Sequence, residues 1–265
     1  MPVKKLIACF DIINGKVTKA KNFFDNVDVA PAEEMAAKLA GEPLDGIIFF
    51  DVTASNEKRR HDFATLKKVA PLVKVTLTVG GGIKTLDDMN DAFEAGADKI
   101  SIDSMAVRNP DLIADGAKRF GSERIVLSTQ IQKVEKTDKI PCGYEVYIDG
   151  ARVATGLDAM EWVKRGEALG AGEVCLNSID RDGTLAGFDI PITGEAAKIL
   201  KGPVIASGGA GKPEHLLELF TQTKSDSAII SSMLYSPRME RNYTATELKQ
   251  YLRDNGIDVT FTPTR

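Results

Sequence analysis

The sequence predicts an α/β fold, a (β/α)8 barrel in which the two halves of the chain repeat each other. Two observations support this prediction. Eight short apolar runs alternate with longer amphipathic stretches, and most runs are continuously apolar, as in parallel strands buried on both faces. Several segments also recur at a nearly constant spacing, which indicates an internal repeat. We expect residues 1–265 to form a single domain, with half-barrels of about residues 1–122 and 123–265.

The eight apolar runs are the expected strands of the barrel. They comprise Leu6–Phe10, Gly46–Phe50, Val75–Val79, Lys99–Ile102, Arg124–Ser128, Glu173–Asn177, Pro203–Ala206 and Ser227–Ile230. No Gly/Ser linker or low-complexity stretch interrupts the series. A closed barrel is therefore favoured, and an open, doubly wound sheet is the alternative.

The helices between the strands have recognisable ends. Asn109 and Pro110 supply an N-cap and a first-turn proline, and Gly121 closes the same helix. Thr85–Asp88 opens another helix, which ends before Gly96. These signals support helices in the intervals between the apolar runs.

Two longer segments follow neither pattern. Ile13–Pro31 comes after the first strand and Gln132–Thr155 after the fifth, where barrel enzymes place mobile active-site loops. We expect both to be irregular. The second should contain a small hairpin, Gly143–Ile148 and Ala151–Ala154, around an Asp149-Gly150 turn.

Composition excludes several classes of protein. A formal charge of −4 argues against nucleic-acid binding, and the basic run Lys58–His61 is interpreted as a solvated loop or helix start. The apolar stretch near the N-terminus is too short for a signal peptide or a membrane span. Of three cysteines, Cys9 and Cys175 fall inside apolar runs and Cys142 does not, which indicates reduced thiols and a cytoplasmic location.

Three pairs of segments match between the halves at a spacing of 127 or 128 residues. The pairs are Val79–Ile83 with Ala206–Ala210, Ser101–Ser104 with Ile229–Ser232, and Asp51–Ser55 with Ser178–Asp182. Glycines after a strand let the backbone approach an anion, and the next helix start offers N–H groups to it. Ser104 and Ser232 would add hydroxyls to these cradles. The glycines could also serve tight turns alone, but two matching copies favour a ligand with two phosphates.

The candidate acid or base is Asp11, at the end of the first strand. The alternative for Asp11 is an ion pair at the barrel rim. The chain has two histidines, His61 and His215, and neither ends a strand. No residue spacing suggests a metal site, and no dinucleotide or Walker motif is present, so we expect no cofactor and no metal.

The chain resembles the cyclase subunit of imidazole glycerol phosphate synthase, a lyase of histidine biosynthesis, along essentially its whole length. The resemblance rests on Ala8–Asp11, Phe50–Ser55, Thr78–Ile83, Gly96–Ser101, Gly170–Glu173, Ser178–Thr184 and Ile205–Gly211. It implies a heterodimer with a glutaminase, whose ammonia passes through the barrel and attacks the formimino carbon of a bis-phosphorylated substrate. The implied products are imidazole glycerol phosphate and an aminoimidazole carboxamide ribonucleotide.

The resemblance also assigns residues. Asp11 matches one catalytic aspartate, and Gln130 stands at the position of the second. Together with the repeat, it predicts that substrate and phosphates are held by Lys19, Gly81, Gly82, Asp103, Ser104, Asn177, Asp182, Gly183, Ser207, Gly208, Gly209, Ser231 and Ser232. The ammonia gate and partner surface would comprise Lys5, Asp98, Lys99 and Glu173.

Four positions depart from the family pattern. Gln130 replaces the second aspartate, and an amide cannot carry a proton. Asp103 replaces an asparagine of the first phosphate cradle, Gly46 a glutamate of the gate, and Ala20 a glycine after the loop lysine. Two other functions are therefore weighed: a diverged paralogue that delivers ammonia to another acceptor, as in amidination of surface sugars, and a non-catalytic scaffold that activates its glutaminase.

Overall fold

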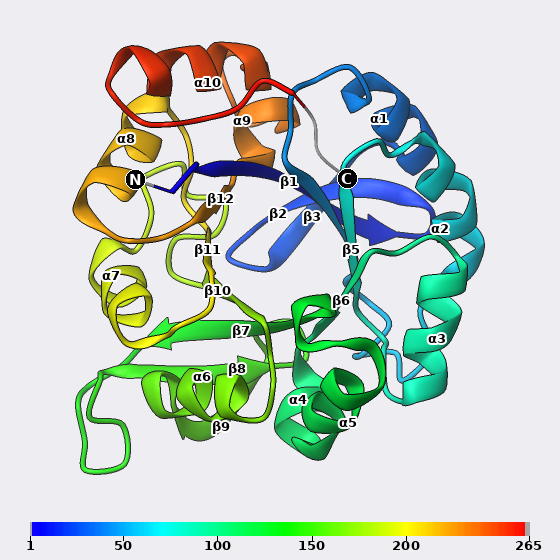
Figure 1. The fold of residues 1–265 in the computed structure, drawn as a ribbon, viewed down its shortest axis with the longest axis vertical. Coiled ribbons are helices and arrows are strands. Elements are labelled where there is room, and N and C mark those ends of the chain that lie inside the picture. The colour runs from blue at the N-terminus through cyan, green and yellow to red at the C-terminus, as the bar shows by residue number, and fades with distance from the viewer. Residues whose placement is uncertain (1, 263–265) are drawn as a thin grey trace.

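Eight parallel strands close into a ring in the computed structural model, which describes residues 2–262 (Figure 1). The ring consists of β1 (Lys5–Ile13), β4 (Gly46–Asp51), β5 (Thr76–Gly80), β6 (Lys99–Ile102), β7 (Ile125–Lys133), β10 (Glu173–Ser178), β11 (Val204–Ser207) and β12 (Ser227–Ile229). Pairing of β12 with β1 and of β10 with β7 completes it. The closed barrel predicted from the sequence is confirmed, and the open sheet is excluded.

Helices surround this ring in Figure 1. They are α1 (Ala32–Leu39), α2 (Phe63–Val69), α3 (Leu86–Glu94), α4 (Ser104–Arg108), α5 (Asp111–Phe120), α6 (Ala159–Ala168), α7 (Ile190–Ile199), α8 (Pro213–Gln222), α9 (Ser231–Tyr235) and α10 (Ala245–Asp254), with short 3-10 turns at Ala70–Leu72 and Ser122–Arg124. Within residues 2–262, none of the helices has the length and apolar character that a membrane crossing requires.

The predicted helix ends are largely correct. Thr85 and Asp88 form a reciprocal capping box at the start of α3, each side chain accepting a hydrogen bond from the other's backbone N–H. Gly121, with φ of 98°, follows the last residue of α5. The predicted N-cap of α5 is wrong by one residue, because Pro110 rather than Asn109 occupies that position, and no side chain caps the helix.

The segment after β1 is not irregular, which corrects the expectation for Ile13–Pro31. It folds into an antiparallel hairpin of β2 (Lys16–Lys21) and β3 (Phe24–Pro31) that continues β1. Its turn has no glycine: Asn22 and Phe23 adopt positive φ of 51° and 65°. A hairpin with such a turn gives no Asn-Gly or Asp-Gly signal in the sequence.

The segment after the fifth strand forms a hairpin, as predicted. Its strands are β8 (Tyr144–Ile148) and β9 (Val153–Asp158). The predicted second strand began too early, because Ala151 belongs to the turn with φ of 64°, as do Asp149 and Gly150 with 56° and 66°. The hairpin extends the sheet at β7, so the parallel ring carries an antiparallel flap after its first and fifth strands.

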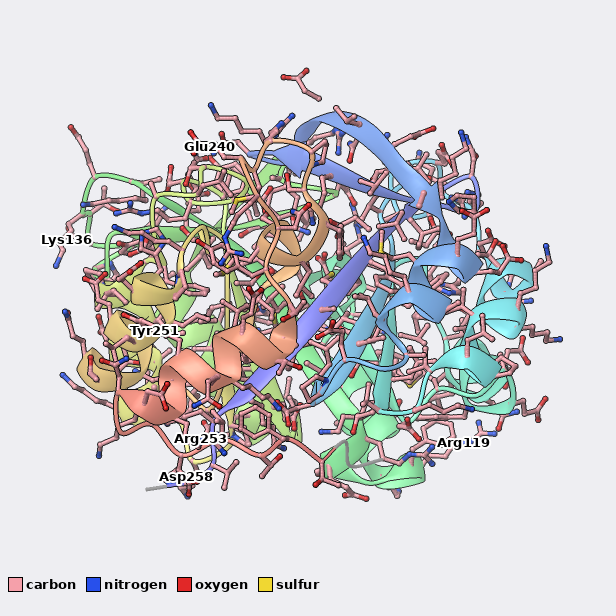
Figure 2. All side chains as sticks on the ribbon, turned by 90° about the horizontal axis from the view of Figure 1, so that it is seen from above. Arg119, Lys136, Glu240, Tyr251, Arg253 and Asp258 are labelled. Carbon is pink, nitrogen blue, oxygen red and sulfur yellow. The ribbon has the colours of Figure 1, made fainter. Side chains whose placement is uncertain are left out.

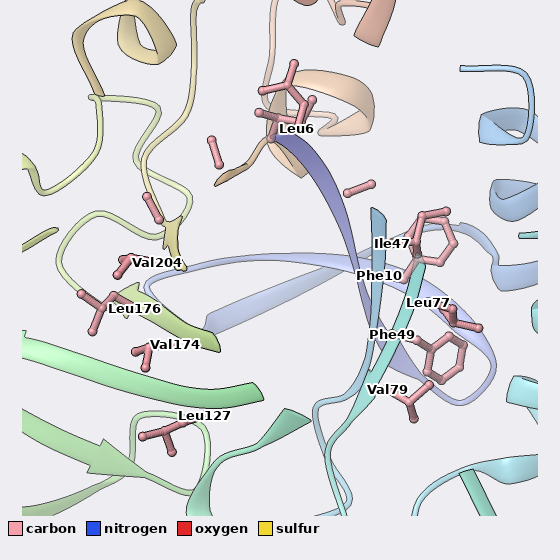
Figure 3. Packing of buried hydrophobic residues seen from close by; sticks show 14 of the residues in the cluster. Leu6, Phe10, Ile47, Phe49, Leu77, Val79, Leu127, Val174, Leu176 and Val204 are labelled. Atoms are coloured by element: carbon pink, nitrogen blue, oxygen red, sulfur yellow. The ribbon is translucent and has the colours of Figure 1, made fainter. Parts of the chain in front are cut away.

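Alternate residues of each strand face two different cores. Side chains such as Leu6, Phe10, Leu77 and Val174 point outward and pack under the helices (Figure 3). The barrel interior is filled by Ile7, Cys9, Ile48, Val126, Cys175, Ile205 and Ile229. The free thiols of Cys9 and Cys175 are thus small apolar core groups.

Charged side chains lie mainly on the outer surface of the barrel. The labelled Arg119, Lys136, Glu240 and Asp258 all lie at the periphery and are exposed (Figure 2). These residues belong to the solvated outer surface, whereas the two cores are apolar.

Candidate active site

A pocket opens at the carboxyl ends of the barrel strands and contains almost all of the expected site residues. Its expected members are Asp11, Lys19, Gly81, Asp103, Ser104, Gln130, Asn177, Asp182, Gly183, Ser207, Gly208, Gly209, Ser231 and Ser232. Gly82 does not line the pocket. Sequence reasoning missed Phe23 and Asn26, which reach the pocket from the unrecognised β2–β3 hairpin, and Arg152, from the β8–β9 turn.

Asp11 is held by the hairpin that follows its own strand. Because β2 pairs back on β1, Lys19 places its Nζ 2.6 Å from Oδ2 of Asp11. Burial lowers the pKa of Lys19, but the acidic groups around it, Asp11 foremost, together outweigh burial and the net shift is upward. The rim ion pair considered from the sequence is therefore present. It also faces the pocket, so the structural and catalytic roles of Asp11 are compatible.

The turn of the β2–β3 hairpin rests on the loop after β10. The N–H of Asn22 donates to the Asp182 carbonyl at 2.9 Å, and its side-chain amide donates to the Ile179 carbonyl at 2.6 Å. The N–H of Phe23 donates to the Asp182 carboxylate at 3.2 Å. Burial raises the pKa of Asp182, and Lys19 opposes the shift. The first flap thus closes one side of the pocket.

The two glycine loops make the same backbone contact in each half. Gly81 has φ of 82°, and a Cβ there would lie 2.1 Å from the Asp51 carbonyl oxygen. Gly208 has φ of 97°, and a Cβ there would lie 2.8 Å from the Ser178 carbonyl oxygen. Asp51 and Ser178 are themselves a pair of the sequence repeat. The glycines are therefore required by close packing of the loops, whatever anion they bind.

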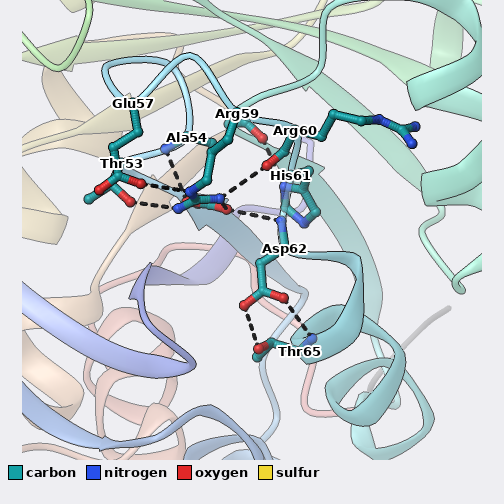
Figure 4. A network of polar contacts seen from close by, with 10 residues as sticks. Thr53, Ala54, Glu57, Arg59, Arg60, His61, Asp62 and Thr65 are labelled. Carbon is teal, nitrogen blue, oxygen red and sulfur yellow. Dashed lines mark hydrogen bonds and ion pairs between the residues drawn. The ribbon is translucent and has the colours of Figure 1, made fainter.

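Asp51 anchors the loop between β4 and α2, whose Arg59, His61 and Asp62 are labelled in Figure 4. Its carboxylate accepts from Arg59 at 2.5 and 2.7 Å and from the N–H groups of Ala54 and Asp62 at 3.2 and 3.0 Å. His61 is buried, and its Nδ1 lies 2.8 Å from the Gly81 carbonyl. The interpretation of Lys58–His61 as a solvated loop is wrong for His61, which is buried and contacts the first glycine loop at Gly81. It is incomplete for Arg59, which is partly exposed but binds Asp51, the residue against which Gly81 packs.

Gln130 lies on the wall opposite Asp11, since β1 and β7 are the first and fifth strands of an eight-strand ring. Its Nε2 donates to Oδ2 of Asp103 at 2.6 Å, and its Oε1 accepts from the Ala151 N–H at 2.5 Å. Ser104 Oγ donates to Oδ1 of Asp103 at 2.9 Å. Burial raises the pKa of Asp103 to about 6, against the opposing effect of these two hydrogen bonds.

The β8–β9 turn is fastened to this cluster. The N–H of Asp149 donates to Ser104 Oγ at 2.9 Å, and the Arg108 guanidinium forms two hydrogen bonds to the Asp149 carboxylate, at 2.9 and 2.5 Å. The hydroxyl expected in the first phosphate cradle is thus engaged by the second flap. In the other half, Ser231 Oγ accepts from the Cys9 N–H at 2.7 Å, and Ser232 lines the pocket.

The residues expected to form the ammonia gate lie at the opposite end of the barrel. Lys5, Lys99 and Glu173 are the first residues of β1, β6 and β10. Lys99 is ion-paired with Glu173, and Lys5 is exposed. The Asp98 carboxylate accepts from the Leu77 N–H at 2.8 Å. Asp226 repeats this contact in the second half with the Val204 N–H at 3.0 Å, so Asp98 has a structural role.

The fold and the pocket define the class of this protein: a (β/α)8 barrel with its polar pocket at the carboxyl ends of the strands, where barrel enzymes place their active sites. Among residues 2–262, no group of three or more His, Cys, Asp or Glu side chains is arranged to hold a metal. The sequence model of the family described as histidine biosynthesis protein matches residues 5–240, and the chain belongs to this family.

Curated relatives cover nearly the whole chain and carry one name, imidazole glycerol phosphate synthase subunit HisF. The protein of Syntrophobacter fumaroxidans is 44% identical over 256 residues, and that of Desulfatibacillum aliphaticivorans 43% over 256 residues, with 97% of each chain covered. The protein of Methanocaldococcus jannaschii is 42% identical over 271 residues, covering 97% of this chain and 98% of its own. The resemblance inferred from the sequence motifs is confirmed.

Proposed function

We propose that this chain is the cyclase subunit of an imidazole glycerol phosphate synthase, a lyase of histidine biosynthesis. The observation that carries the proposal is the pocket, in which Asp11 and the glycine loops of both halves meet at one end of the barrel. The name shared by relatives of more than 40% identity, over nearly the full chain, supports the same assignment.

The pocket residues divide into binding and proton-transfer roles. The second-half loop, with Gly208, Gly209 and Ser232, would hold one phosphate of the substrate, and the first-half loop with Gly81 would hold the other. Asp11 would exchange a proton with the reacting nitrogen. Lys19 would keep Asp11 oriented and stabilise its charge.

A glutaminase partner would supply ammonia at the amino-terminal end of the barrel, beside Lys5, Lys99 and Glu173. The resemblance supports such a heterodimer, and the curated relatives are named as subunits. We also propose a cytoplasmic location, because the buried thiols of Cys9 and Cys175 are unpaired.

The proposal is tested with the purified chain, an ammonium salt and the bis-phosphorylated formimino substrate, by following imidazole glycerol phosphate. Turnover is expected, and Asp11→Asn should lower kcat by about 10²–10⁴-fold, because a positioned acid/base group is lost. Asp115→Asn removes a carboxylate from the exposed side of α5 and should leave the rate unchanged. A native chain without turnover would contradict the proposed function.

A further inference from the structure

Asp103 combines features that no fold requirement explains. It lies at the N-cap position of α4, yet its side chain makes no capping hydrogen bond. Its counterpart in the sequence repeat is Ser231, whose hydroxyl accepts a hydrogen bond from the Cys9 N–H. The barrel therefore accepts a small uncharged residue at this point of the second half, and the carboxylate of Asp103 is not needed to build the first.

Asp103 also differs from the other pocket carboxylates in its partners. Asp11 is paired with Lys19 and Asp51 with Arg59. Asp182 accepts a hydrogen bond from the Phe23 N–H, and the nearby positive charge of Lys19 stabilises its carboxylate. Within residues 2–262, no basic side chain comes within ion-pair distance of Asp103; Arg108 is engaged by Asp149. Asp103 can therefore change its protonation state without breaking an ion pair.

The Asp103 carboxylate is nevertheless held firmly. Gln130 donates to one oxygen and Ser104 to the other, and the backbone of the β8–β9 turn fixes the Gln130 amide from behind. We propose that Asp103 is a catalytic acid/base group of this pocket, acting across the barrel mouth from Asp11, and that Gln130 is the residue that positions it. This inference rests on the proposed function.

The environment suits proton exchange near neutrality. Burial raises the pKa of Asp103 to about 6, while Asp11 is paired with a cation, so the two carboxyls have different surroundings, as acid/base pairs do. Other charged or titratable groups around Asp103 are Arg108 on α4, Asp149 and Arg152 in the β8–β9 turn, and Cys175 on β10.

The proposed step is balanced. As the ammonia nitrogen bonds to the formimino carbon it must lose a proton, and the nitrogen that leaves that carbon must gain one. The Asp103 carboxylate takes the first proton as the new C–N bond forms. The resulting carboxylic acid returns a proton as the old C–N bond breaks, so the group is restored and no further reactant is needed.

The test measures kcat and KM of ammonia-dependent turnover for the native chain and three variants, Asp103→Asn, Gln130→Asp and the double exchange. Asp103→Asn should lower kcat by about 10²–10⁴-fold without raising KM. The double exchange moves the carboxylate to the other side of the hydrogen bond and should recover at least about tenfold of that loss. Gln130→Asp alone should bring no gain, because Asp103 already carries the proton and a second carboxylate beside it is repelled.

The pH profile separates proton transfer from a structural role. At a constant concentration of free ammonia, the native kcat should fall below about pH 6 as Asp103 becomes protonated, and this limb should be absent from the residual rate of Asp103→Asn. Asp103→Glu, which keeps a carboxyl, should retain the limb even if its rate is lower. Asp115→Asn is the matched control on α5, outside the pocket.

Three results would overturn the inference: an Asp103→Asn variant within about threefold of the native kcat, a limb near pH 6 that survives in that variant, or a rise of about 10²-fold in Gln130→Asp alone. The last would mean that the native chain lacks a second proton carrier. A native chain without turnover would contradict the proposed function and this inference together. An active native chain that tolerates Asp103→Asn would contradict the inference alone.

Discussion

Asp103 should make the folded protein less stable at neutral pH than it would be with an amide there. Its pKa rises from 3.8 to about 6 because it is buried, so the unfolded chain gives up the proton more readily than the folded one. The free energy of unfolding should therefore decrease as pH rises from about 4 through 6. Asp103→Asn should stabilise the protein by about 2 kcal/mol at pH 7.5, since one pKa unit corresponds to about 1.4 kcal/mol and the side chain is partly accessible.

Urea unfolding of the native and Asp103→Asn proteins at pH 4.5 and 7.5 checks this expectation. The difference in unfolding free energy should be largest at pH 7.5 and fall to roughly a third of that value at pH 4.5, which lies only slightly above the pKa of the unfolded chain. Asp115→Asn, at an exposed site, should show no such pH dependence. Equal stabilities of the native and Asp103→Asn proteins at pH 7.5 would mean that the carboxylate is well solvated.

Single residues were predictable where chemistry follows directly from position in a strand. Asp11 follows the apolar run Leu6–Phe10 and the glycines follow other apolar runs, so both were found from the sequence. The Gln130–Asp103 hydrogen bond joins residues 27 positions apart and depends on two strands lying side by side. The Asp51–Arg59 pair depends on the path of a loop. Neither partner could be named before the tertiary structure was known.

The β2–β3 hairpin should be sensitive to one glycine of the loop that supports it. Gly183 has φ of 65°, and a Cβ there would lie 2.5 Å from the Ala20 carbonyl oxygen. Gly183→Ala should push the hairpin away from the loop after β10, which would raise KM several-fold and speed proteolysis at the Asn22–Phe23 turn, because closed flaps protect their backbone.

Gly256→Ala is the matched control for this change. Gly256 also has a positive φ, 81°, but no atom lies within 4 Å of its ideal Cβ, so both variants share the backbone strain and only Gly183→Ala adds the collision. Limited proteolysis followed by mass spectrometry locates the cuts. Identical cleavage rates at the Asn22–Phe23 turn in both variants would show that contact with Gly183 does not hold the hairpin.

Elements were predictable in proportion to how regular their local signals are. Most of the barrel strands are predominantly apolar because both faces are buried. All eight were located from the sequence, although β7 continues to Lys133, beyond the predicted end at Ser128. The Asp149-Gly150 pair predicted the turn of the β8–β9 hairpin, whereas Asn22-Phe23 is not a recognised turn signal and the β2–β3 hairpin was missed. The strand β2, which extends the barrel sheet at β1, consists mainly of polar residues, so it lacks the apolar pattern by which a strand is predicted.

At the scale of the whole molecule, the two ends of the barrel should have separate functions. Reversing the exposed charge of Lys5 should weaken association with the glutaminase subunit about tenfold or more, because Lys5 lies at the strand-start end proposed for docking. Asp98 is a poorer choice for this test, since its carboxylate holds the Leu77 N–H and its loss would disturb β5.

Isothermal titration calorimetry of Lys5→Glu with the glutaminase subunit, at two salt concentrations, measures the effect. Lys212→Glu is the charge-matched control, exposed beside the start of α8 at the pocket end of the barrel. Ammonia-dependent turnover should be unchanged in Lys5→Glu, whereas glutamine-dependent turnover should fall. Full affinity in Lys5→Glu, or an equal loss in Lys212→Glu, would argue against docking at the strand-start end.

The closing of the barrel was predictable because eight similar units without a linker leave few other topologies. The repeat was visible as a constant spacing, and its structural basis appears in the Asp98–Leu77 and Asp226–Val204 contacts. The arrangement of the two flaps over the pocket was not predictable, because it depends on contacts between loops from different units.

The matched contacts of Gly81 with Asp51 and of Gly208 with Ser178 have a consequence for how this chain can diverge. Each half serves as a reference copy for the other within one molecule. A position at which both copies make the same contact is required by the packing of the barrel, and a substitution there destabilises the whole fold. A position at which the copies differ, as Asp103 does from Ser231, is free of that constraint and can acquire new chemistry while its twin preserves the scaffold.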